Sequence, residues 1–346
     1  MDDINFELAD KLGYKRPKSP FRNNDLDFFK KAIEESEKFD NFKHLQLISN
    51  SGYKLAFLIF QNGTIEYYEN KSNYIVENKI AYFYTTGSKL YFVCDTENFI
   101  ISHKIREKQK APFLIPETFS KQDNYYKIFE KFLNNNLEKL DADNRYVLDK
   151  TENDPSVIYA DGNEFPVQKY IANPNGDKIP LIRFPDNLYI PKVNGSNFIS
   201  HKLKDTNRRY VNPYLFSGYI GVLFELINSS IISTGSCFND GTGFPSSEHT
   251  NGESIDISFD SKTNSITNLA AIEFAKIRAF KKFHFQKVVI NEICKPQISK
   301  AGFLDSEITY DKKYHKDHFH FGNFNMSKVE NKSKKLEELI GRKNYS

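Results

Sequence analysis

Apolar residues follow two different periods along the first third of the chain. Leu26, Phe29 and Ile33 recur at helical spacing and predict a helix over residues 24–39. From residue 42 the period changes to two, and the apolar run at 55–60, followed by Asn62-Gly63, predicts a strand that enters a hairpin. Further strands are expected near 64–68, 79–86, 89–95 and 97–103. Together these elements predict an antiparallel meander of about five strands with one helix beside it.

Polar segments interrupt the middle of the chain, and the last third returns to alternating strands and helices. Residues 105–123 have the composition of a linker, 125–140 carry a helical apolar stripe, and 141–157 are polar and acidic. Short strands broken by proline and glycine are expected between 158 and 199. The later predicted elements are a helix from Asn212-Pro213 to 228, strands at 231–233, 288–290 and 318–321, a helix capped by Thr267 and running to about 282, and a short helix around 336–340.

These elements predict an α+β protein in four parts. Residues 1–115 form a β-rich accessory or delivery domain, and residues 116–157 form a helical linker. Residues 158–326 form a domain with a small antiparallel sheet flanked by helices, and residues 327–346 form a charged tail. A length of 346 residues agrees with more than one folded unit.

Composition restricts the class of protein more than its function. Hydrophobic residues make up 39% and charged residues 27%, which is typical of a soluble globular protein, and 31 Phe and 20 Tyr predict cores packed with aromatic rings. A net charge of +3 is too small to indicate nucleic-acid binding. Apolar stretches fall short of the roughly 20 residues of a membrane helix. Residues 1–5 lack the basic and apolar pattern of a secretory signal, so synthesis in the cytoplasm without a signal peptide is expected.

The three cysteines, Cys94, Cys237 and Cys294, are widely spaced and contain no CxxC pair. They predict neither a disulfide framework nor a thiolate zinc site. Buried free thiols are the expectation, and a single disulfide bridge is the alternative.

Two short motifs in the last third concentrate histidine and aspartate, at 249–256 and 315–320. Because residues i and i+2 of a strand share a face, His318 and His320 are expected to point together, away from the apolar core. A second strand beside them would add Asp256 to the same polar surface, and the Asn251-Gly252 turn would let His249 fold over it. Imidazoles and a carboxylate suit zinc, and three protein ligands leave a fourth position for water, as in catalytic zinc sites.

This pattern resembles the penicillin-insensitive murein endopeptidases, within the lysostaphin and D-Ala-D-Ala metallopeptidase group. The similarity comprises His249-x6-Asp256 with Gly252 between them and His315-x-x-His318-x-His320 with Asp317 inside, and it covers about residues 205–325. It implies that residues 158–326 form a zinc metallopeptidase domain whose ligands are His249, Asp256 and His320. It also implies that His318 is the catalytic general base or oxyanion stabiliser, and that His315 contacts substrate or lies behind the ligands.

The chain departs from the family at neighbouring positions. Ser246 stands where the family commonly has another histidine. Cys237 is nearest to the place where related carboxypeptidases have an arginine for a substrate carboxylate, which favours an endopeptidase-like site. Glu248 flanks the ligands as an accessory or substrate-binding residue, and a solvated carboxylate is favoured over a general base. A Cys237–His249 amidase is disfavoured, because nothing places the thiol at a helix N-terminus.

The predicted function is zinc-dependent hydrolysis of an amide bond in peptidoglycan cross-link peptides, by a DD- or LD-endopeptidase activity. The alternative is a zinc-dependent module that binds cell-wall peptides without cutting them. Family members are usually exported with a signal peptide, and none is visible here. The expectation is therefore an antibacterial effector that a contractile or type VI-like secretion system exports to the periplasm or cell wall, with an immunity protein as a further partner.

Overall fold

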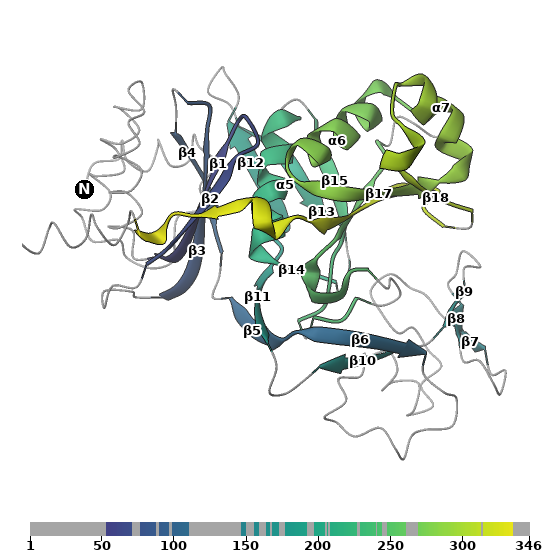
Figure 1. The fold of residues 1–346 in the computed structure, drawn as a ribbon, viewed down its shortest axis with the longest axis horizontal. Coiled ribbons are helices and arrows are strands. Elements are labelled where there is room, and N and C mark those ends of the chain that lie inside the picture. Colours follow the sequence, from purple (N-terminus) through teal and green to yellow (C-terminus); the bar gives the residue numbers. More distant parts are fainter. Residues whose placement is uncertain are drawn as a thin grey trace, which may run out of the picture.

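The computed structural model describes residues 53–70, 77–87, 90–96, 99–110, 147–149, 156–158, 164–166, 168–172, 177–191, 197–204, 206, 208–226, 229–239, 241–243, 248–260, 269–312 and 314–334. The predicted helices at 24–39, 125–140 and 336–340 lie outside these ranges, as does Ser246. Within them the fold is mixed α+β, with mostly sheet and few helices (Figure 1). No helix in these ranges has the length and apolar character needed to cross a membrane.

The first sheet has five strands in the order β20-β2-β1-β3-β4. Its members are β1 (Tyr53–Phe60), β2 (Ile65–Glu69), β3 (Glu77–Thr85), β4 (Leu90–Asp95) and β20 (Val329–Asn331). The predicted hairpin at Asn62-Gly63 is confirmed, since β1 and β2 pair antiparallel across it. The predicted meander is wrong, because β3 runs parallel to β1. β1 is a nearly continuous apolar strand, so it takes a central place, with β2 and β3 on opposite sides.

Eight further short strands of the described residues form three small sheets, of two, three and three strands. The strand predicted at 97–103 is β5, and it pairs with β11 rather than with the first sheet. These strands are β5 (Ile100–His103), β6 (Ile105–Lys110), β7 (Val147–Asp149), β8 (Ser156–Ile158), β9 (Glu164–Pro166), β10 (Gln168–Ala172), β11 (Lys178–Arg183) and β14 (Tyr210–Val211).

The second sheet has seven strands in the order β12-β13-β15-β16-β19-β17-β18. They are β12 (Asn187–Pro191), β13 (Asn197–Leu203), β15 (Ile231–Gly235), β16 (Ile255–Ser258), β17 (Phe285–Asn291), β18 (Thr309–Asp311) and β19 (His318–Phe324). The predicted small antiparallel sheet is confirmed only for the central strands β15, β16, β19 and β17. The pairs β13–β15 and β17–β18 are parallel, so the sheet is mixed. Each parallel pair is joined through a helix, which returns the chain to its starting edge before the next strand begins.

Three α-helices of the described ranges accompany the sheets: α5 (Pro213–Glu225), α6 (Ala271–Lys282) and α7 (Lys295–Lys300). The predicted start of α5 is confirmed, since Asn212 caps the helix by accepting from the backbone N–H of Tyr214. α6 begins at Ala271 after an extended Ala270, so the predicted start beside Thr267 is wrong. Thr267 itself lies outside the described residues.

One hydrophobic core joins the two sheets through α5 (Figure 1). Phe57 of β1 stacks on Tyr82 of β3 at 5.2 Å and meets the ring of Tyr214 of α5 edge-on at 5.2 Å. The Tyr82 hydroxyl donates to the carbonyl of Pro213 at 3.2 Å. β20, from the segment predicted as a tail, pairs with β2 and closes the edge of the first sheet. Buried residues from the ranges 57–93 and 182–329 therefore belong to one core.

Phe57→Ala tests this shared core. Phe57 is fully buried, so truncation should lower the free energy of unfolding by about 3–5 kcal/mol. Because the same core carries β16 and β19 of the second sheet, thermal unfolding should remain one transition at a lower temperature, measured by calorimetry and by near-ultraviolet circular dichroism. Two separated transitions, with the upper one unchanged, would show that the sheets fold independently.

His201 lies inside the core with both ring nitrogens in contact with polar partners. Its Nε2–H donates to the carbonyl of Pro185 at 3.0 Å, and its Nδ1 faces the Tyr219 hydroxyl at 2.6 Å. Burial lowers the pKa of His201 from 6.5 to about 4, against a raising effect of the Pro185 carbonyl. The neutral ring is therefore the form that the folded protein stabilises.

The lowered pKa makes His201 a source of acid sensitivity. Above pH 6.5 the ring is neutral in both states, and between pH 6.5 and 4 the unfolded chain binds the proton while the folded chain does not. Stability is therefore lost as pH falls, by about 3 kcal/mol over this interval. Urea unfolding should show a loss that is smaller by about this amount in His201→Gln than in the wild type, because His249, whose pKa is also lowered by burial, still contributes in both proteins. Equal pH slopes for the two proteins would contradict the assignment.

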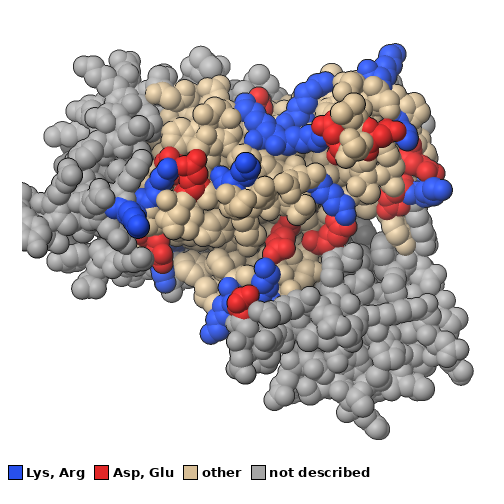
Figure 2. Space-filling view, viewed as in Figure 1, with Lys and Arg blue, Asp and Glu red and all other residues tan. Residues whose placement is uncertain are grey.

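Charges on the face shown in Figure 2 are mixed rather than separated. Described lysine and glutamate side chains pair across elements, as in Lys282 with Glu225 at 2.6 Å and Lys281 with Glu307 at 2.5 Å. Exposed pairs of this kind contribute little to stability.

Candidate metal centre

The site is built on two neighbouring strands of the second sheet, β16 and β19. Asp256 lies directly opposite His320 in the antiparallel register, and Ser258 lies opposite His318. The alternate residues are buried apolar side chains, namely Ile255, Ile257, Phe319 and Phe321. The predicted strand pairing is thus confirmed, with one polar face above an apolar one.

His249 reaches this face from the loop that enters β16. The loop turns sharply because Asn251 and Gly252 adopt positive φ angles of 64° and 66°. A side chain at Gly252 would place Cβ 2.5 Å from the backbone nitrogen of Asn212, so the turn packs directly against the start of α5. The prediction that this turn folds His249 back over Asp256 is confirmed.

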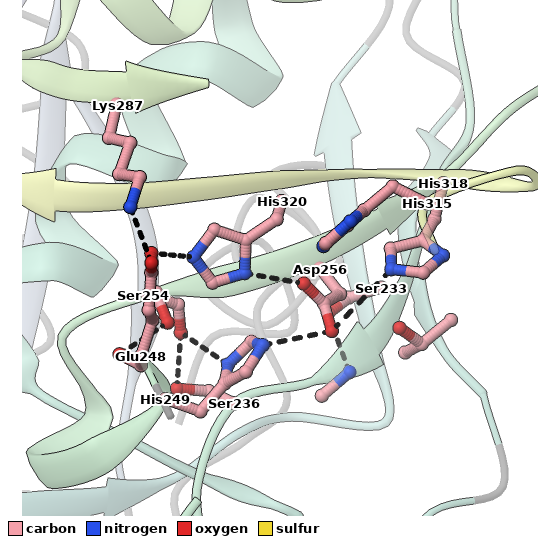
Figure 3. Close-up of polar contacts among 12 residues, drawn as sticks. Ser233, Ser236, Glu248, His249, Ser254, Asp256, Lys287, His315, His318 and His320 are labelled. Carbon is pink, nitrogen blue, oxygen red and sulfur yellow. Dashed lines mark hydrogen bonds and ion pairs between the residues drawn. The ribbon is translucent and has the colours of Figure 1, made fainter. Parts of the chain in front are cut away.

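Three buried side chains converge at this point: His249, Asp256 and His320. His249 Nε2 lies 2.9 Å from Asp256 Oδ2, and His320 Nδ1 lies 2.9 Å from Asp256 Oδ1. One donor atom of each lies within 4.8 Å of the others, so this group could hold a metal ion. Figure 3 shows the Asp256 carboxylate between the two imidazoles.

The second nitrogen of His249 is fixed by the backbone. Its Nδ1 lies 3.2 Å from the carbonyl of Ser254, so Nδ1 carries the proton and donates. The Ser236 hydroxyl donates to the same carbonyl at 2.6 Å and anchors it. This leaves Nε2 unprotonated and facing Asp256, which is the tautomer that a metal requires.

The donor set fits a divalent cation. Among the described residues, His249 Nε2 is buried, faces Asp256 Oδ2 and lacks an aligned hydrogen-bond partner. His320 Nε2 also lacks an aligned partner, but it lies beside Glu248, so Nδ1 is the nitrogen that His320 offers next to Asp256. Buried polar atoms are rarely left unsatisfied. Two imidazoles and one carboxylate are common ligands of zinc and of other transition-metal ions.

The pKa values of the group reflect strong mutual coupling. Burial opposes ionisation of Asp256, but His249 and the other imidazoles outweigh it and hold the pKa of Asp256 well below 3.8. Burial lowers the pKa of His249 to about 4, against the attraction of Asp256. Burial also opposes charge on His320, but Asp256 and Glu248 outweigh it and raise its pKa to about 9. The site therefore holds an ionised carboxylate at neutral pH.

His318 stands at the edge of the group rather than inside it. Its Nε2 lies 4.0 Å from Asp256 Oδ2, and its side chain is 24% exposed, against 3% for His320. Its Nδ1 lies 2.7 Å from Asp317 Oδ1, which orients the ring. The two histidines of one strand thus differ in burial, and His318 is the one that incoming molecules can reach.

His315 lies beside these residues at the strand entrance. Its backbone has a positive φ of 58°, and its Nδ1 lies 2.9 Å from Asp311 Oδ2. Its ring lies 5.0 Å from that of His318 and 5.9 Å from that of His320. The structure therefore brings His315 to the site, as an outer neighbour of the buried group.

Glu248 is not a freely solvated carboxylate. Its Oε2 lies 3.0 Å from His320 Nε2, and its Oε1 pairs with Lys287. These contacts, with His320 first, lower the pKa of Glu248 to about 2 despite partial burial. The Glu248 side chain keeps 37% of its surface exposed, so it is partly solvated as predicted, but it is also paired with His320 and Lys287, which the sequence did not indicate.

Sequence reasoning missed two cationic residues, Lys287 and Arg208. Lys287 precedes the predicted strand 288–290 by one residue, and extending that strand by one residue would have placed Lys287 on the same face as Val289. Arg208 Nη1 lies 3.7 Å from Asp256 Oδ2, and its side chain is only 13% exposed. No local pattern marks Arg208, since it reaches the site from the segment before β14.

The surroundings of Cys237 do not support the alternative of a Cys237–His249 amidase. Its thiol is fully buried and lies 3.1 Å from the carbonyl of Tyr210. Cys94, Cys237 and Cys294 form no disulfide with one another, and the expectation of buried thiols is confirmed for Cys237 and Cys294, whereas Cys94 is only partly buried.

Function has to be inferred from this geometry, because no protein-family model and no curated protein matches the chain.

Proposed function

We propose that this protein is a zinc-dependent amide hydrolase that cleaves peptidoglycan cross-link peptides, with an endopeptidase-like action. The observation that carries the proposal is the buried His249, Asp256 and His320 group with the accessible His318 beside it. Three donors on one side and a reachable histidine on the other support a catalytic site more than a closed structural one. The spacing of these residues, which resembles the murein endopeptidases, supports the substrate class.

The role proposed for each residue follows from how deeply its side chain is buried. His249, Asp256 and His320 would hold the ion, which as a Lewis acid polarises a carbonyl group and makes water more acidic. His318, oriented by Asp317, would accept a proton from the attacking water or stabilise the developing oxyanion. Arg208 would offset part of the negative charge of Asp256.

The test uses purified full-length protein and muropeptide dimers. Conversion to monomers is expected, together with its loss in a chelator and its return when zinc is added back. Mass spectrometry of the products identifies the bond that is cut. Chelator-sensitive binding without conversion would overturn the hydrolase and identify the alternative, a zinc-dependent peptide-binding module. Conversion that persists in the chelator would overturn the metal-dependent mechanism.

A further inference from the structure

His320 has a carboxylate oxygen beside each of its two ring nitrogens: Asp256 beside Nδ1 and Glu248 beside Nε2. Nε2 points away from Asp256 and is buried, and Glu248 Oε2 lies 3.0 Å from it. A ligand imidazole binds metal through one nitrogen and usually donates its other N–H to a carboxylate, carbonyl or water. Glu248 stands in that position for His320.

Glu248 is itself held from two directions. Lys287 pairs with its Oε1, and the Ser254 hydroxyl donates to its backbone carbonyl at 2.8 Å. Figure 3 shows the resulting chain from Lys287 through Glu248 and His320 to Asp256. Because Lys287 holds the carboxylate and Ser254 holds the backbone, the Glu248 side chain loses little freedom when it accepts the N–H of His320.

The sheet register explains why Lys287 can take part. Lys287 on β17 pairs with Gly322 on β19, two residues beyond His320 and on the same face. Position 322 leaves little room for a side chain, because Cβ there would lie 3.0 Å from His320 Nε2 and 3.2 Å from Ser254 Cβ, and these neighbours would have to move. Gly322 thus leaves the space in which the ring and the Glu248 carboxylate meet.

We infer that Glu248, braced by Lys287, is a positioning residue that fixes the orientation and tautomer of His320 for metal binding. This rests on the proposed metal site and adds a specific role within it. With Nε2–H directed at Glu248, Nδ1 is left to bind the ion beside Asp256. Glu248 touches neither the ion nor the substrate in this role.

The experiment measures zinc affinity of the full chain by competition with a chromophoric chelator. Glu248→Gln should bind zinc about 10- to 100-fold more weakly than the wild type. Lys287→Met should weaken binding in the same direction but less, because Glu248 remains. Glu253→Gln is the matched control, since Glu253 lies on the same loop with the same 37% side-chain exposure and pairs with Lys104 instead. Its affinity should equal that of the wild type.

A second measurement separates positioning from a general structural role. Long-range ¹H–¹⁵N spectra of the zinc-loaded wild type should show His320 with its proton on Nε2, and Glu248→Gln should lose this single tautomer. Wild-type affinity in Glu248→Gln, or an unchanged tautomer, would overturn the positioning role. A loss above about a thousandfold would also overturn it, because Glu248 would then be a ligand. Failure of the wild type to bind zinc would instead overturn the proposed metal site itself.

Discussion

Asp256→Asn is expected to abolish tight zinc binding. Asp256 lies between both imidazoles, at 2.9 Å from each, and an amide lacks the charge that balances the ion. If a binding free energy of about 10–16 kcal/mol is shared among three ligands, losing one costs roughly 4 kcal/mol, or about a thousandfold in affinity. Equilibrium dialysis against buffered zinc, with metal analysis of the retained protein, measures this directly.

The matched control for this variant is Asp186→Asn. Asp186 is an exposed aspartate that pairs with Arg209, far in sequence from the donor residues. It should bind one zinc per chain with the affinity of the wild type. Retention of wild-type affinity by Asp256→Asn would remove the carboxylate from the site.

His318→Ala should separate catalysis from metal binding. His318 is outside the buried group of three, so zinc affinity should stay at the wild-type value. Loss of a proton-transfer group typically lowers the rate by about 10²- to 10⁴-fold, and kcat should fall by this factor with little change in KM. Initial rates on muropeptide dimers, with zinc content measured in the same samples, test both halves of the prediction.

Lys312→Ala is the control for His318→Ala, because Lys312 is an exposed residue between β18 and the strand that carries His318. It should keep both zinc and activity. If His318→Ala lost zinc, the residue would act as a ligand. If it kept full kcat, proton transfer would have to depend on another group, with His315 the nearest histidine ring.

The candidate site was largely predictable because its geometry is local. Strand alternation alone places His318 and His320 on one face, and the Asn251-Gly252 turn accounts for the return of His249. Strand alternation could not predict how deeply each histidine is buried. His320 is enclosed by Glu248 and Gly322 whereas His318 is not, and that difference depends on which strand lies beside β19.

The fold was predictable element by element and much less so in its connections. The strands at β1, β15 and β17 lie where apolar runs indicated them, but the parallel pairing of β1 with β3 depends on crossovers that leave no local pattern. The pairing of β20 with β2 joins residues more than two hundred and fifty positions apart, and a short charged segment gave no indication of it. Arg208 illustrates the same limit, since only tertiary packing brings it to Asp256.

The substrate bond, the secretion route and an immunity partner stay predictions of the sequence pattern. The metal centre can be tested without knowing any of them. Its central requirement is that one ion lies among His249, Asp256 and His320.

The most direct measurement is anomalous X-ray scattering at the zinc edge from crystals of the zinc-loaded protein. One strong anomalous peak is expected within bonding distance of His249, Asp256 and His320, with His318 nearby but unbound. A zinc-loaded crystal with no anomalous peak among these three residues, or with its peak elsewhere on the chain, would contradict the proposed function at its foundation.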